Sequence, residues 1–217
     1  MTDEACQQCA PLIPLTAVVL AAGSSQRMGR AKLLIPLKGR PLFQHVVDQV
    51  AASRLREIVL VVGSEADEIL AALEIPRNSG LRVVRNEEFA QGQGLSLRTG
   101  LLALGDDSQG AAIFLADQPG IAPALIDELA EAFLAGTALA LRPVYEGEGG
   151  DKVPSHPVFL CASVIREVLD EIKGDTGLRG ILGEHPDWLR EVAVPGQAPQ
   201  DIDTPEDLEA YLGQASD

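Results

Sequence analysis

The chain has 217 residues, with 17 Lys or Arg against 32 Asp or Glu, which gives a formal net charge of −15. This acidic balance argues against general nucleic-acid binding, which needs a basic face, and against binding to anionic membranes. No apolar run approaches the roughly 20 residues of a membrane helix, and the N-terminus lacks the features of a signal peptide. We therefore expect a cytoplasmic protein, in which a locally positive site can still bind a small anion.

Apolar strands alternate with helices along the chain. Short apolar runs that end at Gly or polar residues predict strands at residues 16–21, 57–62, 81–85, 111–116, 137–141, 158–161 and 189–194. Helical spacing of apolar residues predicts helices at residues 41–52, 65–73, 95–104, 123–134, 163–172, 176–182 and 205–212. This alternation is typical of an α/β fold, with a doubly wound, mostly parallel sheet in a three-layer α/β/α arrangement.

The N-terminal segment has the composition of a tail. We interpret residues 1–14 as a flexible leader and residues 15–217 as a single domain. Cys6 and Cys9 form a C-x-x-C pair, a spacing that also serves metal binding or redox chemistry. No second pair of ligands accompanies it in the sequence, so a leader without such chemistry is the favoured interpretation.

Two local features predict how elements are connected. Residues 145–154 are rich in Gly and charge, which predicts a mobile loop. Ser64 is expected to cap the helix at residues 65–73, with Asp67 in the capping-box position three residues later.

The segment VVLAAGSSQRMGRAK, residues 18–32, places glycines, hydroxyls and cations directly after the first predicted strand. In a parallel sheet, ligands bind outside the carboxyl ends of the strands, where this segment emerges. Ser24 and Ser25 would add hydrogen-bond donors to the freed backbone amides, and Arg27 and Lys32 would neutralise phosphate charge. The segment therefore predicts a phosphate-binding loop, with an ordinary βα loop as the alternative. It matches neither the G-x-x-x-x-G-K-[ST] pattern nor the dinucleotide pattern G-x-G-x-x-G.

Acidic residues also lie near the predicted ligand-binding edge of the sheet. Asp117 comes directly after the fourth predicted strand, and Mg²⁺ prefers one or two carboxylates together with phosphate oxygens. Asp117 is therefore a candidate metal ligand, with a turn residue as the alternative. In the sequence DIDTPEDL, the residues from Thr204 to Asp207 suit a helix start, which leaves Asp201 and Asp203 unexplained.

Residues 20–32 read L-A-A-G-x-S-x-R-M-G-x-x-K, a pattern that resembles the signature of the MobA-like nucleotidyltransferase family. Within that family it is most similar to the molybdenum cofactor cytidylyltransferases of the MocA type. Guanylyltransferase relatives usually carry LAGG, so Ala22 points to CTP. The resemblance implies a Rossmann-like nucleotidyltransferase fold in which Arg27 and Lys32 are catalytic. It implies nucleotide binding by Leu20, Ala21, Ala22, Gly23, Ser24, Ser25 and Gly29.

The resemblance also implies which residues bind the metal ion and which lie near the nucleotide base. Asp117, in the D-Q-P motif, and Asp203, the Asp before Thr-Pro, are implied ligands of Mg²⁺ or Mn²⁺. The family's G-x-x-x-S-L segment lies near the nucleotide base, which implies that Gly94 and Ser96 bind there. A simple helix N-cap is the alternative role for Ser96.

The second half is expected to hold the acceptor substrate. His156-Pro157-Val158 resembles the family's G-[HN]-P-V, although Ser155 replaces the Gly. Residues 174–179 resemble its G-D-x-G-A-R segment, with Leu in place of Ala. The resemblance implies that His156, Gly177 and Arg179 bind the acceptor. A structural histidine and a capped surface helix are the alternatives.

The implied reaction is transfer of CMP from CTP to the phosphate of molybdopterin or Mo-molybdopterin. The products would be molybdopterin cytosine dinucleotide and pyrophosphate, and the recipient would be a molybdenum hydroxylase or its chaperone. A guanylyltransferase or another NTP transferase on the same fold is one alternative. A non-catalytic nucleotide- or cofactor-binding chaperone is another. An NAD-dependent oxidoreductase is disfavoured, because its glycine fingerprint is missing.

Overall fold

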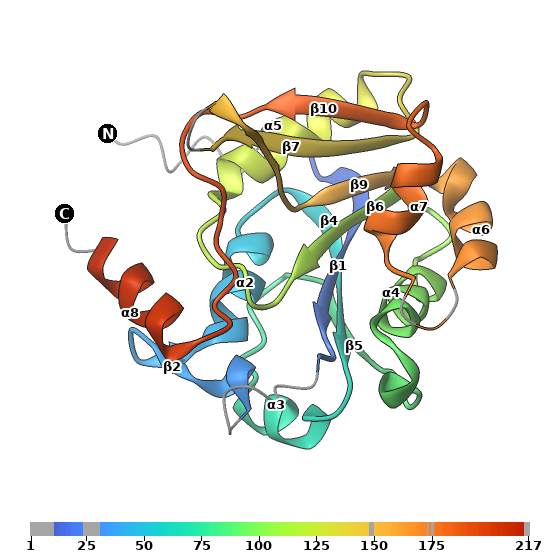
Figure 1. Ribbon diagram of the computed structural model, residues 1–217. Coiled ribbons are helices and arrows are strands. Elements are labelled where there is room, and N and C mark those ends of the chain that lie inside the picture. Colours follow the sequence, from blue (N-terminus) through green and yellow to red (C-terminus); the bar gives the residue numbers. More distant parts are fainter. Residues whose placement is uncertain (1–10, 24–30, 148–149, 173, 175, 215–217) are drawn as a thin grey trace.

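The computed structural model describes residues 11–23, 31–147, 150–172, 174 and 176–214 (Figure 1). An eight-stranded sheet has the order β10-β7-β9-β6-β1-β4-β5, with β8 paired to β7. β6, β1, β4 and β5 are parallel neighbours, β10 is parallel to β7, and β9 is antiparallel to β6 and β7. The strands are β1 (Ile13–Ala21), β4 (Leu55–Val62), β5 (Leu81–Arg85), β6 (Gly110–Leu115), β7 (Ala140–Glu146), β8 (Lys152–Pro154), β9 (Val158–Cys161) and β10 (Leu189–Ala193).

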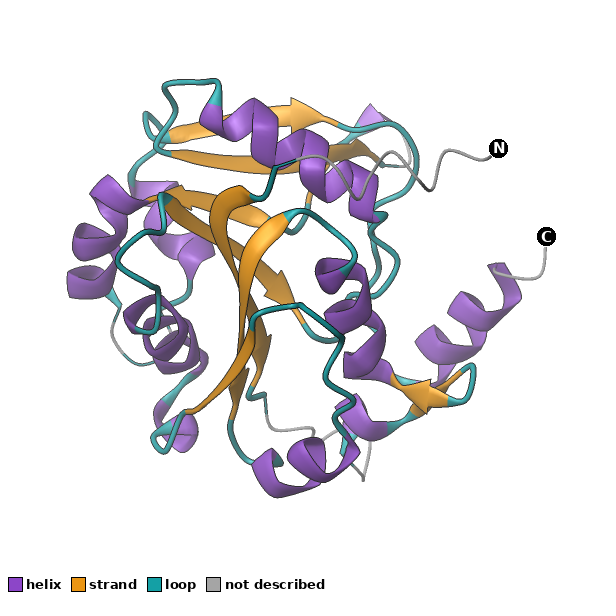
Figure 2. Cartoon of the chain, turned by 180° about the vertical axis from the view of Figure 1, so that it is seen from behind, coloured by secondary structure: helices purple, strands orange, loops and turns teal. Residues whose placement is uncertain are grey.

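Helices cover both faces of this sheet (Figure 2). α2, α3 and α5 pack on one face, and α4, α6 and α7 pack on the other. No helix of the described ranges is long and apolar enough to cross a membrane. The helices are α2 (Leu42–Ala51), α3 (Ala66–Ala72), α4 (Gln93–Leu102), α5 (Pro123–Leu134), α6 (Ala162–Glu171), α7 (Leu178–Glu184) and α8 (Pro205–Gln214), with 3-10 turns η2 (Lys32–Leu34) and η3 (Phe89–Gln91).

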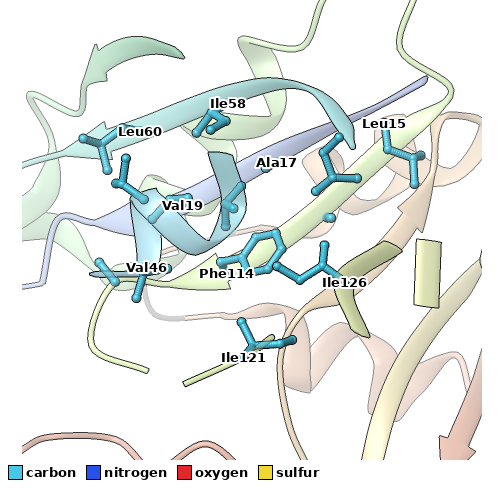
Figure 3. Close-up of a cluster of buried hydrophobic side chains, with 14 of the residues drawn as sticks. Leu15, Ala17, Val19, Val46, Ile58, Leu60, Phe114, Ile121 and Ile126 are labelled. Carbon is cyan, nitrogen blue, oxygen red and sulfur yellow. The ribbon is translucent and has the colours of Figure 1, made fainter. Parts of the chain in front are cut away.

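Each central strand contributes to two cores, because successive side chains of a strand point to opposite faces of the sheet. In β1, Leu15, Ala17 and Val19 belong to the core under α2 and α5, whereas Val18 belongs to the core under α4. Figure 3 shows the first of these cores, in which Phe114 of β6 lies near the β1 side chains. Burial on both faces explains why these strands are almost continuously apolar in sequence.

A third, smaller core lies apart from the two main ones. It contains Leu37 and Leu42, from the segment that follows Lys32, and Ile202, which precedes α8. Leu208 and Tyr211 of α8 pack against it. Leu37 belongs to a short hairpin of β2 (Pro36–Leu37) and β3 (Arg40–Pro41), and α8 lies beside this hairpin in Figure 1. The small core therefore joins the C-terminal part of the chain to the segment that carries Lys32.

The predicted fold class is confirmed: the sheet is mostly parallel and helices cover both faces. All seven predicted strands and all seven predicted helices are present, with bounds that differ by a few residues. The largest shift is in β7, which begins at Ala140 and extends five residues beyond the expected 137–141. β1 begins at Ile13, whose amide donates to the carbonyl of Arg54, inside the expected leader 1–14. Residues 1–10 of that leader, with Cys6 and Cys9, lie outside the described residues.

Two local predictions differ from the structure, and one element was not predicted. Within the segment 145–154, β7 continues through the buried Tyr145 and pairs with β8, which makes an antiparallel hairpin of the described residues. Residues 148 and 149 lie outside the described residues. Ser64 does not cap α3, since Glu65 occupies the N-cap and no side-chain hydrogen bond caps the helix. The β2–β3 hairpin was not predicted, because two-residue strands carry no periodicity that a sequence can display.

Candidate active site at the carboxyl edge of the sheet

The parallel strands bring several loops to one edge of the sheet. The Ala116 amide donates to the Leu20 carbonyl at 3.1 Å, and the Asn86 amide donates to the Val62 carbonyl at 2.8 Å. These bonds extend the ladder just past the ends of β6 and β5, so the residues that follow are held firmly. Asp117 is the next residue after this extended β6, at the edge where α/β proteins bind ligands.

Lys32 joins two carboxylates that are far apart in sequence. Its Nζ lies 2.7 Å from Oδ2 of Asp117 and 2.5 Å from Oδ1 of Asp203. Lys32 comes from η2, Asp117 from the end of β6, and Asp203 from the segment before α8. The structure therefore brings together one of the two predicted catalytic cations and both predicted metal ligands.

Burial and charge act in opposite directions on this lysine. Its side chain is 10% exposed, and the loss of hydration alone would lower the pKa of Lys32. The charges and hydrogen bonds of Asp117 and Asp203 outweigh this effect, so the pKa of Lys32 is raised. Lys32 therefore remains a cation at neutral pH, as a phosphate-binding role requires.

The carboxylate pair fits a divalent cation. Oδ1 of Asp117 is buried and has no hydrogen-bond partner among the described residues, so it presents a free oxygen ligand. Asp203 is 48% exposed, which leaves its side open to a ligand and to water. No cluster of three or more His, Cys, Asp or Glu side chains suited to a metal occurs among the described residues. Two carboxylates suffice for Mg²⁺ when phosphate oxygens and water complete its coordination.

Asp201 and Gln118 are hydrogen-bonded to each other next to this carboxylate pair. Nε2 of Gln118 donates to Oδ1 of Asp201 at 2.6 Å, and Oε1 of Gln118 is buried without a partner. Loss of hydration, followed by the charge of Asp117, raises the pKa of Asp201. The helix start at Thr204 left Asp201 unexplained in the sequence, and the role of Gln118 was missed. Its place beside Asp117 in the D-Q-P motif was the available signal.

His156 lies close enough to Asp117 for their charges to interact. Burial lowers the pKa of His156 to about 4, although the charge of Asp117 opposes this shift. The imidazole is therefore neutral at pH 7, and its buried Nδ1 has no hydrogen-bond partner. An unpaired ring nitrogen beside the carboxylate site is compatible with the predicted contact to an acceptor substrate.

Asn86 and Ser96 form a buried pair at the neighbouring strand end. Nδ2 of Asn86 donates to Oγ of Ser96 at 3.0 Å, and Oδ1 of Asn86 accepts from the Glu88 amide at 3.0 Å. Ser96 lies inside α4, which begins at Gln93, so an N-cap role for Ser96 is wrong. Its hydroxyl instead fixes the loop that follows β5.

Gly94 connects the two halves of the chain. Its amide donates to the Gly174 carbonyl at 3.2 Å, and an added Cβ would lie 2.5 Å from the Thr176 carbonyl oxygen. The absence of a side chain therefore lets the backbone of Gly174 and Thr176 approach α4. This contact gives Gly94 a packing role, whether or not a nucleotide base also lies nearby.

Gly177 and Arg179 line a cavity of about 840 Å³ between α6 and α7. Neither Lys32, Asp117 nor Asp203 is among its lining residues, so the carboxylate site and this cavity are distinct. The hydrogen bond from the Gly94 amide to the Gly174 carbonyl links the segment between α6 and α7 to the start of α4. The assignment of Gly177 and Arg179 to the acceptor substrate thus stays a prediction.

The rest of the first loop is described only in part. Ser24, Ser25, Arg27 and Gly29 lie outside the described residues. Ala21 and Ala22 are buried and Leu20 is partly buried, so their backbone is what remains for a ligand. Gly23 is exposed, and an added Cβ would have no atom within 4 Å.

Residues 17–188 match the MobA-like NTP transferase domain. The chain belongs to this family. The match confirms the resemblance seen in residues 20–32 and covers Lys32, Asp117 and His156. Membership of the MobA-like NTP transferase family supports a nucleotidyltransferase activity.

Curated relatives carry different activities in their names. Nicotine blue oxidoreductase of Paenarthrobacter nicotinovorans is 27% identical over 203 residues, which cover 91% of this chain and 96% of that protein. The bifunctional protein GlmU of Agrobacterium fabrum is 36% identical over 131 residues, or 58% of this chain. The aligned region is 28% of the length of that GlmU, so the match concerns one part of a longer protein.

Solved structures share the fold over nearly the whole chain. Rv0371c of Mycobacterium tuberculosis H37Rv superposes with a TM-score of 0.77 at 29% identity, covering 92% of this chain and 98% of that one. A structure of Rv0371c in complex with manganese has a TM-score of 0.72 at 25% identity, covering 94% and 100%. 4-Diphosphocytidyl-2C-methyl-D-erythritol synthase of Anaerococcus prevotii shares the fold, with a TM-score of 0.75 at 19% identity and 94% and 96% coverage.

Proposed function

We propose that the protein transfers CMP from CTP to the phosphate of molybdopterin, giving molybdopterin cytosine dinucleotide and pyrophosphate. The observation that carries the nucleotidyl-transfer part is the convergence of Asp117 and Asp203 on Lys32 at the carboxyl edge of the sheet. The choice of CTP and molybdopterin rests on the sequence pattern around Ala22, which is similar to the MocA-type enzymes.

The residues present suit a reaction that needs positioning and charge neutralisation more than proton transfer. The acceptor phosphate is largely ionised near neutral pH, since its second pKa is about 6, so no general base is required. Its oxygen forms the new bond to the α-phosphorus while the bond to the pyrophosphate oxygen breaks. Lys32, still protonated at this pH, would stabilise the charge of the triphosphate and of the departing pyrophosphate.

Asp117 and Asp203 would hold Mg²⁺ or Mn²⁺, which would neutralise charge on the phosphate oxygens. Oδ1 of Asp117 favours this assignment, because it is buried and no described residue donates a hydrogen bond to it. Arg27 is the second catalytic cation proposed from the sequence pattern. His156 is proposed to contact the acceptor through its unpaired Nδ1.

The direct test is an assay of product formation. The purified chain would be incubated with Mg²⁺, molybdopterin and each of the four nucleoside triphosphates in turn, and pyrophosphate and the dinucleotide would be measured. We expect turnover with CTP, and a loss of about 100-fold or more in Lys32→Ala and in Asp117→Ala. Lys152→Ala is the matched control, because Lys152 is an exposed lysine that pairs with Glu191 in β10. Turnover with GTP in place of CTP would contradict the cytidylyl assignment, and full activity of Asp117→Ala would contradict the site.

A redox reaction is the second candidate function. It is favoured by a relative that aligns over 91% of this chain and bears the name of an oxidoreductase. The same preparation would therefore be supplied with reduced nicotinamide cofactors and an oxidised dye, and cofactor oxidation would be followed by absorbance. Oxidation without pyrophosphate formation in the first assay would favour this candidate over nucleotidyl transfer.

A further inference from the structure

The two carboxylates at Lys32 are held in different ways. Asp117 follows a central strand, whose ladder extends to Ala116. Asp203 lies outside any strand or helix, in the segment between β10 and α8, and its side chain is 48% exposed. A ligand on such a segment needs separate support, because a positioning error of about 1 Å weakens a metal or catalytic site strongly.

Asp207, in the first turn of α8, provides that support. Its Oδ2 accepts hydrogen bonds from the Asp203 amide at 3.0 Å and from the Thr204 amide at 2.8 Å. The Asp207 amide in turn donates to Oγ1 of Thr204 at 3.2 Å. The Thr204 and Asp207 contacts form a capping box, but the bond to the Asp203 amide goes beyond what the helix itself requires.

Neighbouring contacts fix this unit relative to the rest of the site. The Ile202 amide donates to the Asp117 carbonyl at 3.1 Å, which joins the backbones on either side of the carboxylate pair. The Ile202 side chain is fully buried against Leu37 and Leu42, close in sequence to Lys32. These two contacts hold the start of α8 against the carboxylate site.

We propose that Asp207 is a positioning residue, which holds the backbone of Asp203 so that its carboxylate and that of Asp117 bind one divalent cation. This inference rests on the proposed function, because it takes Asp117 and Asp203 as the cation ligands. In this proposal Asp207 is not a ligand of the cation, because its Oδ2 accepts hydrogen bonds from the two backbone amides.

The test is the affinity of the whole chain for Mn²⁺, measured by electron paramagnetic resonance of the free ion, without nucleotide and below the unfolding temperature of every variant. Asp207→Ala is expected to bind Mn²⁺ about tenfold more weakly, as is usual when the support of a metal ligand is removed. Asp207→Asn keeps an oxygen acceptor but loses the charge, and it should stay within about threefold of the wild type.

Thr204→Ala separates positioning from helix stability. It removes the cap hydroxyl and lowers the melting temperature, yet it leaves both bonds from Asp207 Oδ2 to the backbone. We expect its Mn²⁺ affinity to match the wild type. Equal weakening in Thr204→Ala and Asp207→Ala would overturn the proposal in favour of general stability, and equal weakening in Asp207→Asn and Asp207→Ala would overturn it in favour of charge.

Asp203→Asn distinguishes a failure of this inference from a failure of the proposed function. If Asp203→Asn loses Mn²⁺ affinity and Asp207→Ala does not, Asp203 is a ligand and the positioning role of Asp207 is wrong. If neither Asp203→Asn nor Asp117→Asn changes the affinity, the cation site of the proposed function is wrong, and the role of Asp207 falls with it.

Discussion

Lys32 contacts the same two carboxylates that the proposed cation would use. Its ammonium group is therefore expected to compete with a divalent cation until a triphosphate draws the lysine away. Removal of this one side chain should therefore strengthen binding of the cation, whereas removal of an ordinary ligand weakens it.

We predict that Lys32→Met raises the affinity for Mn²⁺ in the absence of nucleotide by about tenfold, which corresponds to roughly 1.4 kcal/mol. The estimate is modest because Asp203 is half exposed and solvent screens its charge. Titration of Mn²⁺ by electron paramagnetic resonance measures this, with Lys152→Met as the control for loss of a lysine elsewhere. An unchanged or weaker affinity in Lys32→Met would show that the lysine does not occupy the cation position.

His156 gives a prediction for stability against pH. Its pKa is about 4 in the folded protein, whereas an exposed histidine has about 6.5. Between these values the unfolded chain binds more protons, so the free energy of unfolding falls as the pH is lowered. At pH 4.5 the loss from this residue is about 2–3 kcal/mol.

His156→Gln should lack that component. Urea unfolding of the wild type and of His156→Gln at pH 7.5 and pH 4.5 measures the difference. Carboxylates remote from His156 contribute equally to both proteins, so the comparison reports the histidine together with its interaction with Asp117. The same pH dependence in both proteins would mean that the imidazole is not held neutral by burial.

At the scale of elements, the contact between α4 and the backbone of Gly174 and Thr176 depends on Gly94. A Cβ there would lie 2.5 Å from the Thr176 carbonyl oxygen and 2.7 Å from the Gly174 carbonyl oxygen, both backbone atoms. We predict that Gly94→Ala lowers the free energy of unfolding by about 1–3 kcal/mol, as overpacking usually does.

Gly183→Ala is the matched helical control, because an added Cβ at Gly183 meets no atom within 4 Å. Helix propensity alone should make this substitution neutral or stabilising by up to about 1 kcal/mol. Chemical unfolding of both variants tests the claim. Equal stability of Gly94→Ala and the wild type would mean that the backbone of Gly174 and Thr176 can shift with no loss in the free energy of unfolding.

Elements with strong patterns were predictable from the sequence, and short or long-range features were not. β4 and α5 were expected almost to the residue, since burial on both sheet faces and Pro123 at the helix start leave clear signals. The β2–β3 hairpin has two residues per strand and no pattern, so only tertiary contacts define it. The Gln118–Asp201 bond spans 83 positions in sequence, a separation that no local rule bridges.

At the scale of the whole molecule, the fold explains why residues from three distant parts of the chain meet. Parallel strands deliver Asp117 to one sheet edge, and the small core around Ile202 brings the C-terminal segment to Lys32. The sequence predicted Lys32 and Asp117 as site residues from their positions after predicted strands, and Asp203 through the family resemblance. That Lys32 bridges the two carboxylates follows only from the three-dimensional arrangement.

The most direct measurement of the central claim is thermal unfolding with Mg²⁺ and each nucleoside triphosphate at saturation. A ligand at 100 times its Kd adds about 2.7 kcal/mol to stability, which is roughly 5–10 °C in Tm for a domain of this size. We predict such a shift with CTP and its loss in Lys32→Ala. A shift with GTP alone, or none with CTP, would contradict the account.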